Sequence, residues 1–371
     1  MTAVPYLDLS RARARIAPAL EERWRRVLDA NAYVLGPEVK EFEGAFRAFL
    51  GARGVVAVAN GTDALTVSLR ALGLRPGDEV IVPAFSFFAT AEAVVLAGGT
   101  PVFCDIDPRT FNLDVDDCAA RVTPRTVGIV GVHLYGRPFD AGRVNALCSK
   151  HGLWLLEDAA QAQGARYRGR RVGTLGTLAA WSFYPTKNLG AYGDAGAVSG
   201  MDEELLGKVQ LAANHGQSSR YHHVGIGTNS RLDSLQAAVL NLRLPLLDGD
   251  NAARRKLAAL YAEGLAGVGD VRLPLDHPDD ECVVHQMTIA TARRDELAEH
   301  LRQAGVGSSV HYPSPLHRQP ALEALGLETG ALPHAERAAA EVLCLPMFAE
   351  LTAGEVEVVV AAVRSFYAGR T

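Results

Sequence analysis

Residues 153–190 read LWLLEDAAQAQGARYRGRRVGTLGTLAAWSFYPTKNLG. Two short apolar runs within this stretch, Leu153–Glu157 and Leu178–Phe183, predict β-strands. An acid, Asp158, follows the first run, and a lysine, Lys187, follows the second. Ligands bind at the carboxyl ends of strands in α/β sheets. We therefore expect Asp158 and Lys187 to lie near one edge of a sheet and to take part in ligand binding.

The same alternation of strands and helices extends to both sides of this stretch. Continuous apolar strands separated by helices are typical of a largely parallel sheet that is buried on both faces. We therefore predict an α/β fold with a mostly parallel, mixed sheet flanked by helices. The further predicted strands are Val55–Ala59, Glu79–Val82, Pro101–Asp105, Val127–Val132 and Gly196–Ser199, and the predicted helices are Asp63–Leu72, Thr90–Ala97, Ala141–His151 and Asp202–Asn214.

Two further regions frame the predicted sheet. Residues 11–30 carry apolar residues at helical spacing and predict one amphipathic helix, and residues 38–50 repeat the pattern, so we predict an N-terminal helical arm. After a predicted helix at Leu232–Leu244 the sequence changes character. We predict a large domain over residues 1–245 and a smaller C-terminal α+β domain over residues 246–371. The elements predicted there are a strand at Cys282–Ala290 and helices at Asn251–Gly264, Arg294–Ala304, Pro333–Leu343 and Ala353–Tyr367.

The bulk composition excludes several classes of protein. The 371 residues suggest about two domains at roughly 150 residues each. The net charge of -5 argues against a general nucleic-acid binder, which would show a basic excess. The 5 cysteines form no CxxC pair, so we expect reduced thiols rather than a zinc site or a disulfide framework. A signal-peptide core and an apolar run of roughly 20 residues are both missing, so we expect a cytoplasmic protein without a membrane span.

The residue types at the predicted sheet edge suit an aromatic cofactor. Asp158 can pair with a protonated pyridine nitrogen and keep the ring electron-poor, although a helix cap would also explain this residue. Gln161 follows closely enough to contact a ring oxygen. Lys187 has apolar and small neighbours, which can lower the pKa of its amine and favour an imine. Its alternative role is that of an ordinary solvated lysine.

Three other segments offer contacts to the rest of such a cofactor. Ser182 offers a hydroxyl to a phosphate. Gly61 permits a tight turn after a strand and Thr62 can cap the next helix, whose N-terminus would bind phosphate. A simple strand–turn–helix cap explains these two residues equally well. Phe87 can stack on a flat ring or serve as a core aromatic. Together these segments and the Asp158–Lys187 pair are typical of a pyridoxal 5'-phosphate (PLP) site.

A series of motifs carries a resemblance over essentially the whole chain. The chain resembles the DegT/StrS family of sugar aminotransferases, which have the type I aspartate aminotransferase fold. The matching motifs, in chain order, are NGTDAL (60–65), PGDEVIVP (76–83), VHLYG (132–136), EDAAQAQGARYRG (157–169), SFYPTKNLGAYGDAGA (182–197), GTNSRLDSLQAAVL (227–240) and HYPSPLH (311–317).

The resemblance implies a role for each candidate residue. Lys187 matches the Schiff-base lysine, which also moves protons during catalysis, and Asp158 matches the partner of the pyridine nitrogen. Asn229 matches an asparagine that reaches the cofactor phosphate of a neighbouring subunit, so a homodimer is implied. The other cofactor contacts implied are Gln161 at the phenolic oxygen, Phe87 on the ring, and Gly61, Thr62 and Ser182 at the phosphate.

The family resemblance also implies a substrate class. Relatives take an amino group from L-glutamate and transfer it to a nucleotide-linked keto-sugar. A branch of dehydratases has histidine at the position of Lys187, so lysine favours transamination. Several stretches resemble enzymes that act at C-3 of UDP- or dTDP-linked sugars, which favours a 3-keto substrate and leaves a 4-keto substrate as the alternative.

Four residues are candidates for substrate binding. Arg231 could take a carboxylate or diphosphate in two parallel hydrogen bonds, or form a structural salt bridge. His311 and Tyr312 belong to a predicted substrate-side loop. Tyr221 belongs to residues 215–223, a predicted mobile loop near the partner subunit, whose histidine spacing suits no metal site.

Two other functional classes compete with an aminotransferase. A non-catalytic PLP-binding regulator would need an output module such as a helix-turn-helix, for which the motifs leave no residues. A cysteine desulfurase would need a cysteine on a mobile loop near the cofactor, and none of the 5 cysteines has that context.

Overall fold

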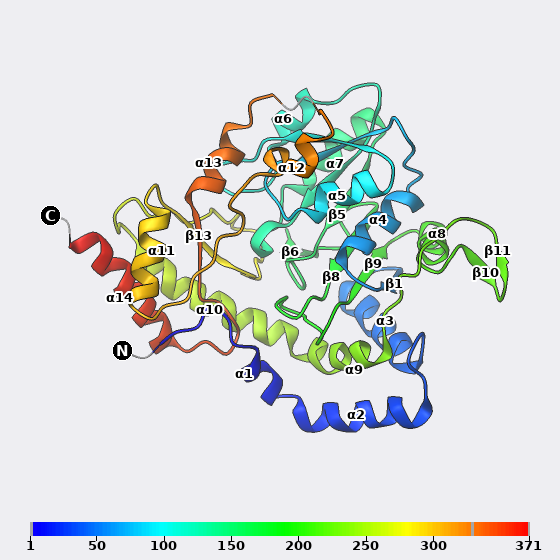
Figure 1. Ribbon diagram of the computed structural model, residues 1–371, viewed down its shortest axis with the longest axis horizontal. Helices are drawn as coiled ribbons and strands as arrows, with labels where there is room; N and C mark the ends of the chain where they lie inside the picture. The colour runs from blue at the N-terminus through cyan, green and yellow to red at the C-terminus, as the bar shows by residue number, and fades with distance from the viewer. Residues whose placement is uncertain (1–2, 328–329, 370–371) are drawn as a thin grey trace.

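A seven-stranded mixed sheet lies at the centre of the computed structural model, which describes residues 3–327 and 330–369 (Figure 1). The strand β9 runs antiparallel to both of its neighbours, β1 and β8, and the remaining neighbours pair in parallel. The carboxyl ends of the six other strands therefore meet at one edge. In spatial order the strands are β1 (Gly54–Val58), β9 (Gly196–Gly200), β8 (Leu178–Ser182), β5 (Trp154–Asp158), β4 (Thr126–Val132), β2 (Glu79–Pro83) and β3 (Thr100–Cys104).

Helices bury both faces of this sheet. Adjacent residues of β2 point to opposite cores, with Val80 in one and Ile81 in the other, because side chains alternate along a strand. One core is covered by α4 (Gly61–Ala71), α5 (Ala89–Leu96) and α8 (Glu203–Ala213), and the other by α3 (Pro37–Leu50), α6 (Val115–Ala120), α7 (Ala141–His151) and α9 (Ser234–Arg243). The predicted α/β fold with a mostly parallel sheet is confirmed.

The N-terminal arm contains two helices where the sequence predicts one over residues 11–30. The helix α1 (Leu9–Ala14) ends before α2 (Ala17–Ala30), with Pro18 in the first turn of α2. Proline lacks the N–H that a helix interior needs, but a first turn leaves that N–H unpaired in any case. The single-helix prediction is therefore wrong.

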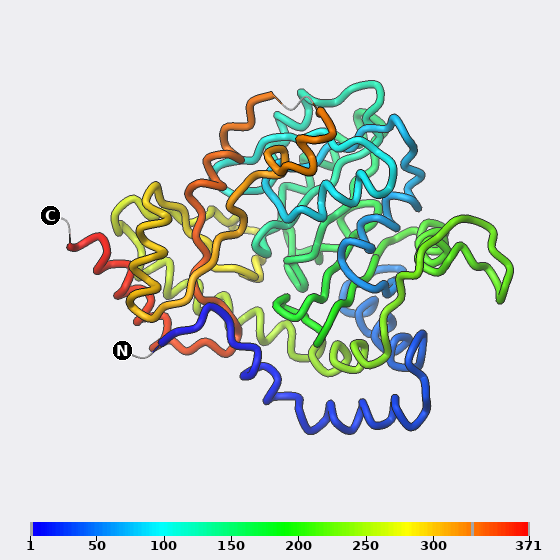
Figure 2. Tube along the Cα trace, in the orientation of Figure 1, coloured from blue at the N-terminus to red at the C-terminus, as the bar shows by residue number. Residues whose placement is uncertain are grey.

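The first described residues pack against the C-terminal half of the chain (Figure 2). The amide of Val4 donates to the carbonyl of Gly305 at 3.0 Å, and its carbonyl accepts from Gly307 at 2.8 Å. Arg11 forms two hydrogen bonds to Glu355, at 2.9 and 2.6 Å. The N-terminal segment is thus joined to the C-terminal part of the fold by both backbone and side-chain contacts.

The C-terminal part has its own apolar core beneath a two-stranded sheet. Strand β12 (Met287–Ala290) pairs antiparallel with β13 (Val342–Leu345). The predicted helix Pro333–Leu343 is shorter than expected, since its last residues belong to β13. The division of the chain after residue 245 stays a prediction. The helices here are α10 (Leu247–Leu265), α11 (Arg294–Gln303), α12 (Pro320–Glu323), α13 (Pro333–Glu341) and α14 (Ala353–Ala368).

The remaining elements are short. Within the described ranges, no helix combines the length and the apolar character that crossing a membrane requires. All 5 cysteines are buried free thiols, as predicted. The short strands are β6 (Arg166–Tyr167), β7 (Arg170–Arg171), β10 (Gln217–Ser219) and β11 (His222–His223), and the 3-10 helices are Leu134–Gly136, Leu244–Leu246 and Leu316–Arg318.

Candidate active site

The carboxyl edge of the sheet brings the predicted cofactor residues together. Asp158 ends β5 and Ser182 ends the adjacent strand β8. A Cβ atom placed on Gly61, the first residue of α4, would lie 2.6 Å from the Cβ of Ser182. Only glycine lets the start of α4 approach β8 this closely, because that separation is far below ordinary carbon contacts. The glycine at position 61 is therefore required by packing against Ser182.

The start of α4 differs from the prediction in one detail. Thr62 is not the cap of this helix. The cap is Asn60, whose side-chain oxygen accepts a hydrogen bond from the amide of Asp63 at 2.8 Å. Asn60 and Thr62 are both residue types that favour this role, and the structure starts the helix two residues earlier than a Thr62 cap requires. The N-terminus of α4 still faces the edge that carries Ser182.

Asp158 is buried and hydrogen-bonded at both carboxylate oxygens. Its Oδ2 accepts from the Thr90 hydroxyl at 2.8 Å, and its Oδ1 accepts from the amide of Ala160 at 3.3 Å. Burial raises the pKa of Asp158, while these two hydrogen bonds and the nearby charge of Lys187 oppose that rise. No helix begins at this residue, so the alternative of a helix cap is wrong. The two hydrogen bonds therefore fix the Asp158 carboxylate at the sheet edge, where a ligand could bind.

Lys187 lies in the loop between β8 and β9 and is not an ordinary surface lysine. Burial lowers its pKa from 10.5 to about 8, and the carboxylate of Asp158 opposes that decrease. Burial and the charge of Lys187 also lower the pKa of His311 to about 4 and that of His285 well below its usual range. Lys187, Asp158, His285 and His311 therefore belong to one electrostatic group. His285 was not predicted from the sequence.

A buried network of amide side chains fixes the loop that carries Lys187. Asn188 donates to the Asn251 side chain at 2.9 Å and to the carbonyl of Val283 at 3.0 Å. Asn251 donates to the carbonyl of Gln163 at 2.9 Å, and Gln163 donates to the carbonyl of Ser182 at 2.6 Å. These bonds join the Lys187 loop to α10 and to the end of β8. The position of Lys187 relative to Ser182 is therefore set by the buried core.

Gln161 connects the predicted cofactor residues to the predicted substrate loop. Its Oε1 accepts from the amide of Tyr135 at 2.6 Å, and its Nε2 donates to the Tyr312 hydroxyl at 3.1 Å. The Tyr312 ring lies 5.9 Å from the ring of Phe87, which is 55% exposed. Phe87 is therefore not a core aromatic and presents its ring beside Tyr312. A side-chain amide has two N–H donors, so one remains on Gln161 for a ligand.

Three further predicted residues, Tyr221, Asn229 and Arg231, form no hydrogen bond or ion pair with Lys187, Asp158 or Gln161 within the described part of one chain. Tyr221 is 81% exposed on the β10–β11 hairpin, which protrudes at the right of Figure 1. The loop predicted over residues 215–223 contains this short hairpin, and its mobility stays a prediction. Asn229 is exposed, and the Nε of Arg231 is buried without a hydrogen-bond partner. Among the described residues, Arg231 forms no ion pair, so the alternative role of Arg231 in a structural salt bridge is not supported.

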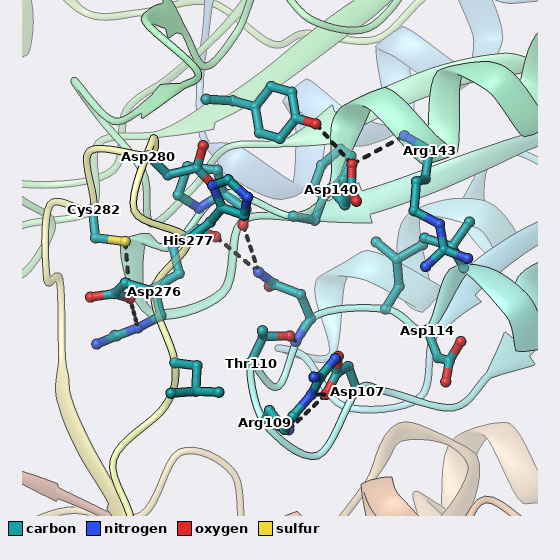
Figure 3. Close-up of a pocket in the computed structure, with 18 of the residues that line it drawn as sticks. Asp107, Arg109, Thr110, Asp114, Asp140, Arg143, Asp276, His277, Asp280 and Cys282 are labelled. Carbon is teal, nitrogen blue, oxygen red and sulfur yellow. Dashed lines mark hydrogen bonds and ion pairs between the residues drawn. The ribbon is translucent and has the colours of Figure 1, made fainter.

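A cavity with a volume of about 210 Å³ lies away from these residues (Figure 3). Its carboxylates already have partners. Asp107 pairs with Arg109 at 2.7 Å, and Asp140 accepts from Tyr167 at 2.8 Å. Neither Lys187 nor Asp158 lines this cavity. In the described part of the chain, no three His, Cys, Asp or Glu side chains are grouped in a way that could hold a metal ion.

Comparison with known proteins identifies the family. The model of the DegT/DnrJ/EryC1/StrS aminotransferase family matches residues 15–364. The chain belongs to this family. A relative called pleiotropic regulatory protein, from Geobacillus stearothermophilus, is 45% identical, with 98% of each chain covered. The UDP-2-acetamido-2-deoxy-3-oxo-D-glucuronate aminotransferase of Pseudomonas aeruginosa is 44% identical, covering 97% of this chain and 99% of the relative.

A solved structure shows the same fold. The crystal structure of DesV from S. venezuelae, in complex with a ketimine intermediate, superposes with a TM-score of 0.96. It is 44% identical, and 99% of each chain is covered. The predicted family and its fold are therefore confirmed, and the chain is a PLP-dependent aminotransferase by family.

Proposed function

We propose that this chain binds PLP through Lys187 and transfers the amino group of L-glutamate to a nucleotide-linked 3-keto-sugar. The observation that carries the proposal is the buried carboxylate of Asp158 at the end of β5, which interacts electrostatically with Lys187 in the loop after β8, in a member of an aminotransferase family. When bound, PLP supplies an electron sink for breaking and forming bonds at the amino-bearing carbon.

The residues at the sheet edge fit this cofactor. The start of α4 and the hydroxyl of Ser182 lie against each other without an intervening Cβ, which suits a phosphate at a helix N-terminus. Asp158 would hold the pyridine nitrogen protonated, and the free N–H of Gln161 would donate to the ring oxygen. Phe87 would cover the ring. These roles are the ones that the family resemblance implies, and the residue types at the sheet edge suit them.

Lys187 is suited to proton transfer. A general base works best when its pKa is near the working pH, and a value of about 8 leaves a large neutral fraction under mildly alkaline conditions. The amine can then take a proton from the donor's α-carbon and return it at a neighbouring atom.

The substrate assignment is supported by the relatives and by Arg231. The Pseudomonas aeruginosa relative is named for a UDP-linked 3-oxo sugar acid, which is a nucleotide-linked 3-keto-sugar. The buried Nε of Arg231 has no partner in the described structure and could donate to a carboxylate or diphosphate. His311 and Tyr312 would contact the sugar, since both lie beside the predicted cofactor residues.

We propose a homodimer as the working unit, in the cytoplasm, where reduced thiols persist. Tyr221, Val224 and Ile226 are large apolar side chains that are exposed in one chain, and Ile226 is 95% exposed. Covering this hairpin with a second copy would remove it from water, and Asn229 and Tyr221 would then reach the partner's site. Light scattering during size-exclusion chromatography tests this, and a monomer at micromolar concentration would contradict it.

The activity test uses the purified protein, L-glutamate, and UDP- and dTDP-linked 3-keto and 4-keto sugars. We expect amino-sugar from a 3-keto substrate and none from the Lys187→Ala variant. Product only from 4-keto sugars would correct the position of amination. Failure with every sugar, in a protein that binds PLP, would refute the sugar assignment and favour the regulatory alternative that one relative's name suggests.

A further inference from the structure

Two buried hydroxyl groups, those of Thr90 and Ser86, extend the hydrogen bonding of Asp158. Thr90, near the start of α5, is 1% exposed and lies 2.8 Å from the Asp158 carboxylate. Ser86, in the loop before α5, is 3% exposed, and its Oγ lies 2.8 Å from the Oγ1 of Thr90. The three side chains form a continuous line from the loop after β2 to the end of β5.

The direction of the protons along this line follows from the donors available. An ionised carboxylate can only accept, so Thr90 must donate its one hydroxyl proton to Asp158. The Thr90 oxygen is then free to accept the proton of Ser86. The amide of Ala160, whose hydrogen cannot be reoriented, donates to the other carboxylate oxygen at 3.3 Å. The amide can only donate and so favours the ionised form of Asp158, and the Thr90 hydroxyl stabilises that form when it donates.

We propose that Thr90 is a positioning residue that keeps Asp158 ionised and fixes its orientation, with Ser86 setting the direction of the Thr90 hydroxyl. The inference rests on the proposed PLP site, in which Asp158 faces the pyridine nitrogen. An ionised Asp158 keeps that nitrogen protonated and the ring electron-poor. A carboxylate without the Thr90 bond binds its own proton more tightly, because burial already disfavours its charge.

The test compares three variants in the PLP-loaded protein. Thr90→Val removes the hydroxyl and nearly keeps the side-chain volume, and Thr90→Ser keeps the hydroxyl. The matched control is Thr288→Val, which changes an equally buried threonine in β12, whose hydroxyl lies 3.3 Å from the sulfur of Cys344. The rate of the half-reaction with L-glutamate alone is measured, together with the pH dependence of the cofactor's visible absorption.

We expect Thr90→Val to lower the half-reaction rate about tenfold with little change in the apparent affinity for glutamate. Tenfold corresponds to about 1.4 kcal/mol, which is near the value of a hydrogen bond to a charged group. The pH midpoint of the visible absorption should shift in Thr90→Val only. Thr90→Ser should stay within about twofold of the unaltered protein, because it keeps the donor.

Two results would overturn the proposal. One is an unchanged rate and pH midpoint in Thr90→Val. The other is an equal loss in Thr90→Ser or Thr288→Val, which would show a packing effect. Because glutamate alone is used, failure of the sugar assignment leaves the comparison intact. If the protein binds no PLP, the proposed function fails, but the role of Thr90 can still be tested. The pKa of Asp158 is then measured from the carbon-13 resonance of its carboxyl group, and Thr90→Val must raise that pKa.

Discussion

The lowered pKa of Lys187 leads to a quantitative prediction about its reactivity. The pKa decreases from 10.5 to about 8 on burial. At pH 8 about half of the Lys187 side chains are then neutral, compared with about 0.3% for an ordinary lysine. The difference is roughly 160-fold in neutral amine and is equivalent to about 3.4 kcal/mol of disfavoured charging. Only the neutral amine is a nucleophile, so its acylation should follow this pKa.

The assay is trace acetylation of the protein across a pH series, after any bound cofactor has been released with hydroxylamine. Peptide mass spectrometry reports the labelling of each lysine. Lys208, which is exposed and pairs with Glu204 at 2.8 Å, is the internal control, because that pair raises its pKa. The pH midpoint is compared rather than the absolute rate, since Lys187 is less accessible. In Asp158→Asn the Lys187 midpoint should move to lower pH.

A Lys187 midpoint equal to that of Lys208 would refute the reasoning, as would an upward shift in Asp158→Asn.

The lowered pKa of Lys187 also affects the stability of the protein. The unfolded chain keeps the ordinary value of 10.5, so between about pH 8 and 10.5 it binds a proton at this lysine that the native protein lacks. The contribution of Lys187 to the free energy of unfolding should therefore increase with pH in that window and be constant below it.

Three further predictions concern stability and access. Asn251→Leu removes the hydrogen bonds to Asn188 and Gln163 and should lower the free energy of unfolding by about 2–3 kcal/mol, measured in urea. Thr352→Ala breaks the capping box of α14 and should cost about 1 kcal/mol by the same measurement, and an unchanged midpoint would contradict the role of the cap. A thiol-specific chromogenic disulfide should label none of the buried cysteines in the native protein and all 5 in denaturant.

The candidate site was predictable where a chemical group follows an apolar run. Asp158 and Lys187 come after strands of one parallel set, so local patterns predict that both lie at the same edge. The resemblance added roles to these positions. The location of Gln161 beside Tyr312 could not be predicted locally, because their hydrogen bond joins residues 151 positions apart.

The features of the fold and the site that local sequence patterns do not predict depend on long-range packing. Asn188 and Asn251 have no pattern that separates a buried amide from an exposed one, and their hydrogen bond spans 63 positions. The strand β13 follows a helix without a turn residue, so Val342–Leu345 continues the helical pattern in the sequence. The pairing of this segment with β12 determines that it forms a strand instead. The sequence predicts Thr90 only as the first residue of a helix, because its contact with Asp158 depends on where β5 packs.

The hydrogen bonds of the N-terminal segment affect when this part of the protein can fold during synthesis. They join Val4 to Gly305 and Gly307, and Arg11 to Glu355. The Arg11–Glu355 contact spans 344 positions, so it cannot form until Glu355 has left the ribosome. At about 5–20 residues per second, this segment waits roughly 17–70 seconds without its partner. The central sheet can form during that interval, whereas the contacts of the N-terminal segment with the C-terminal core can form only after Glu355 has emerged.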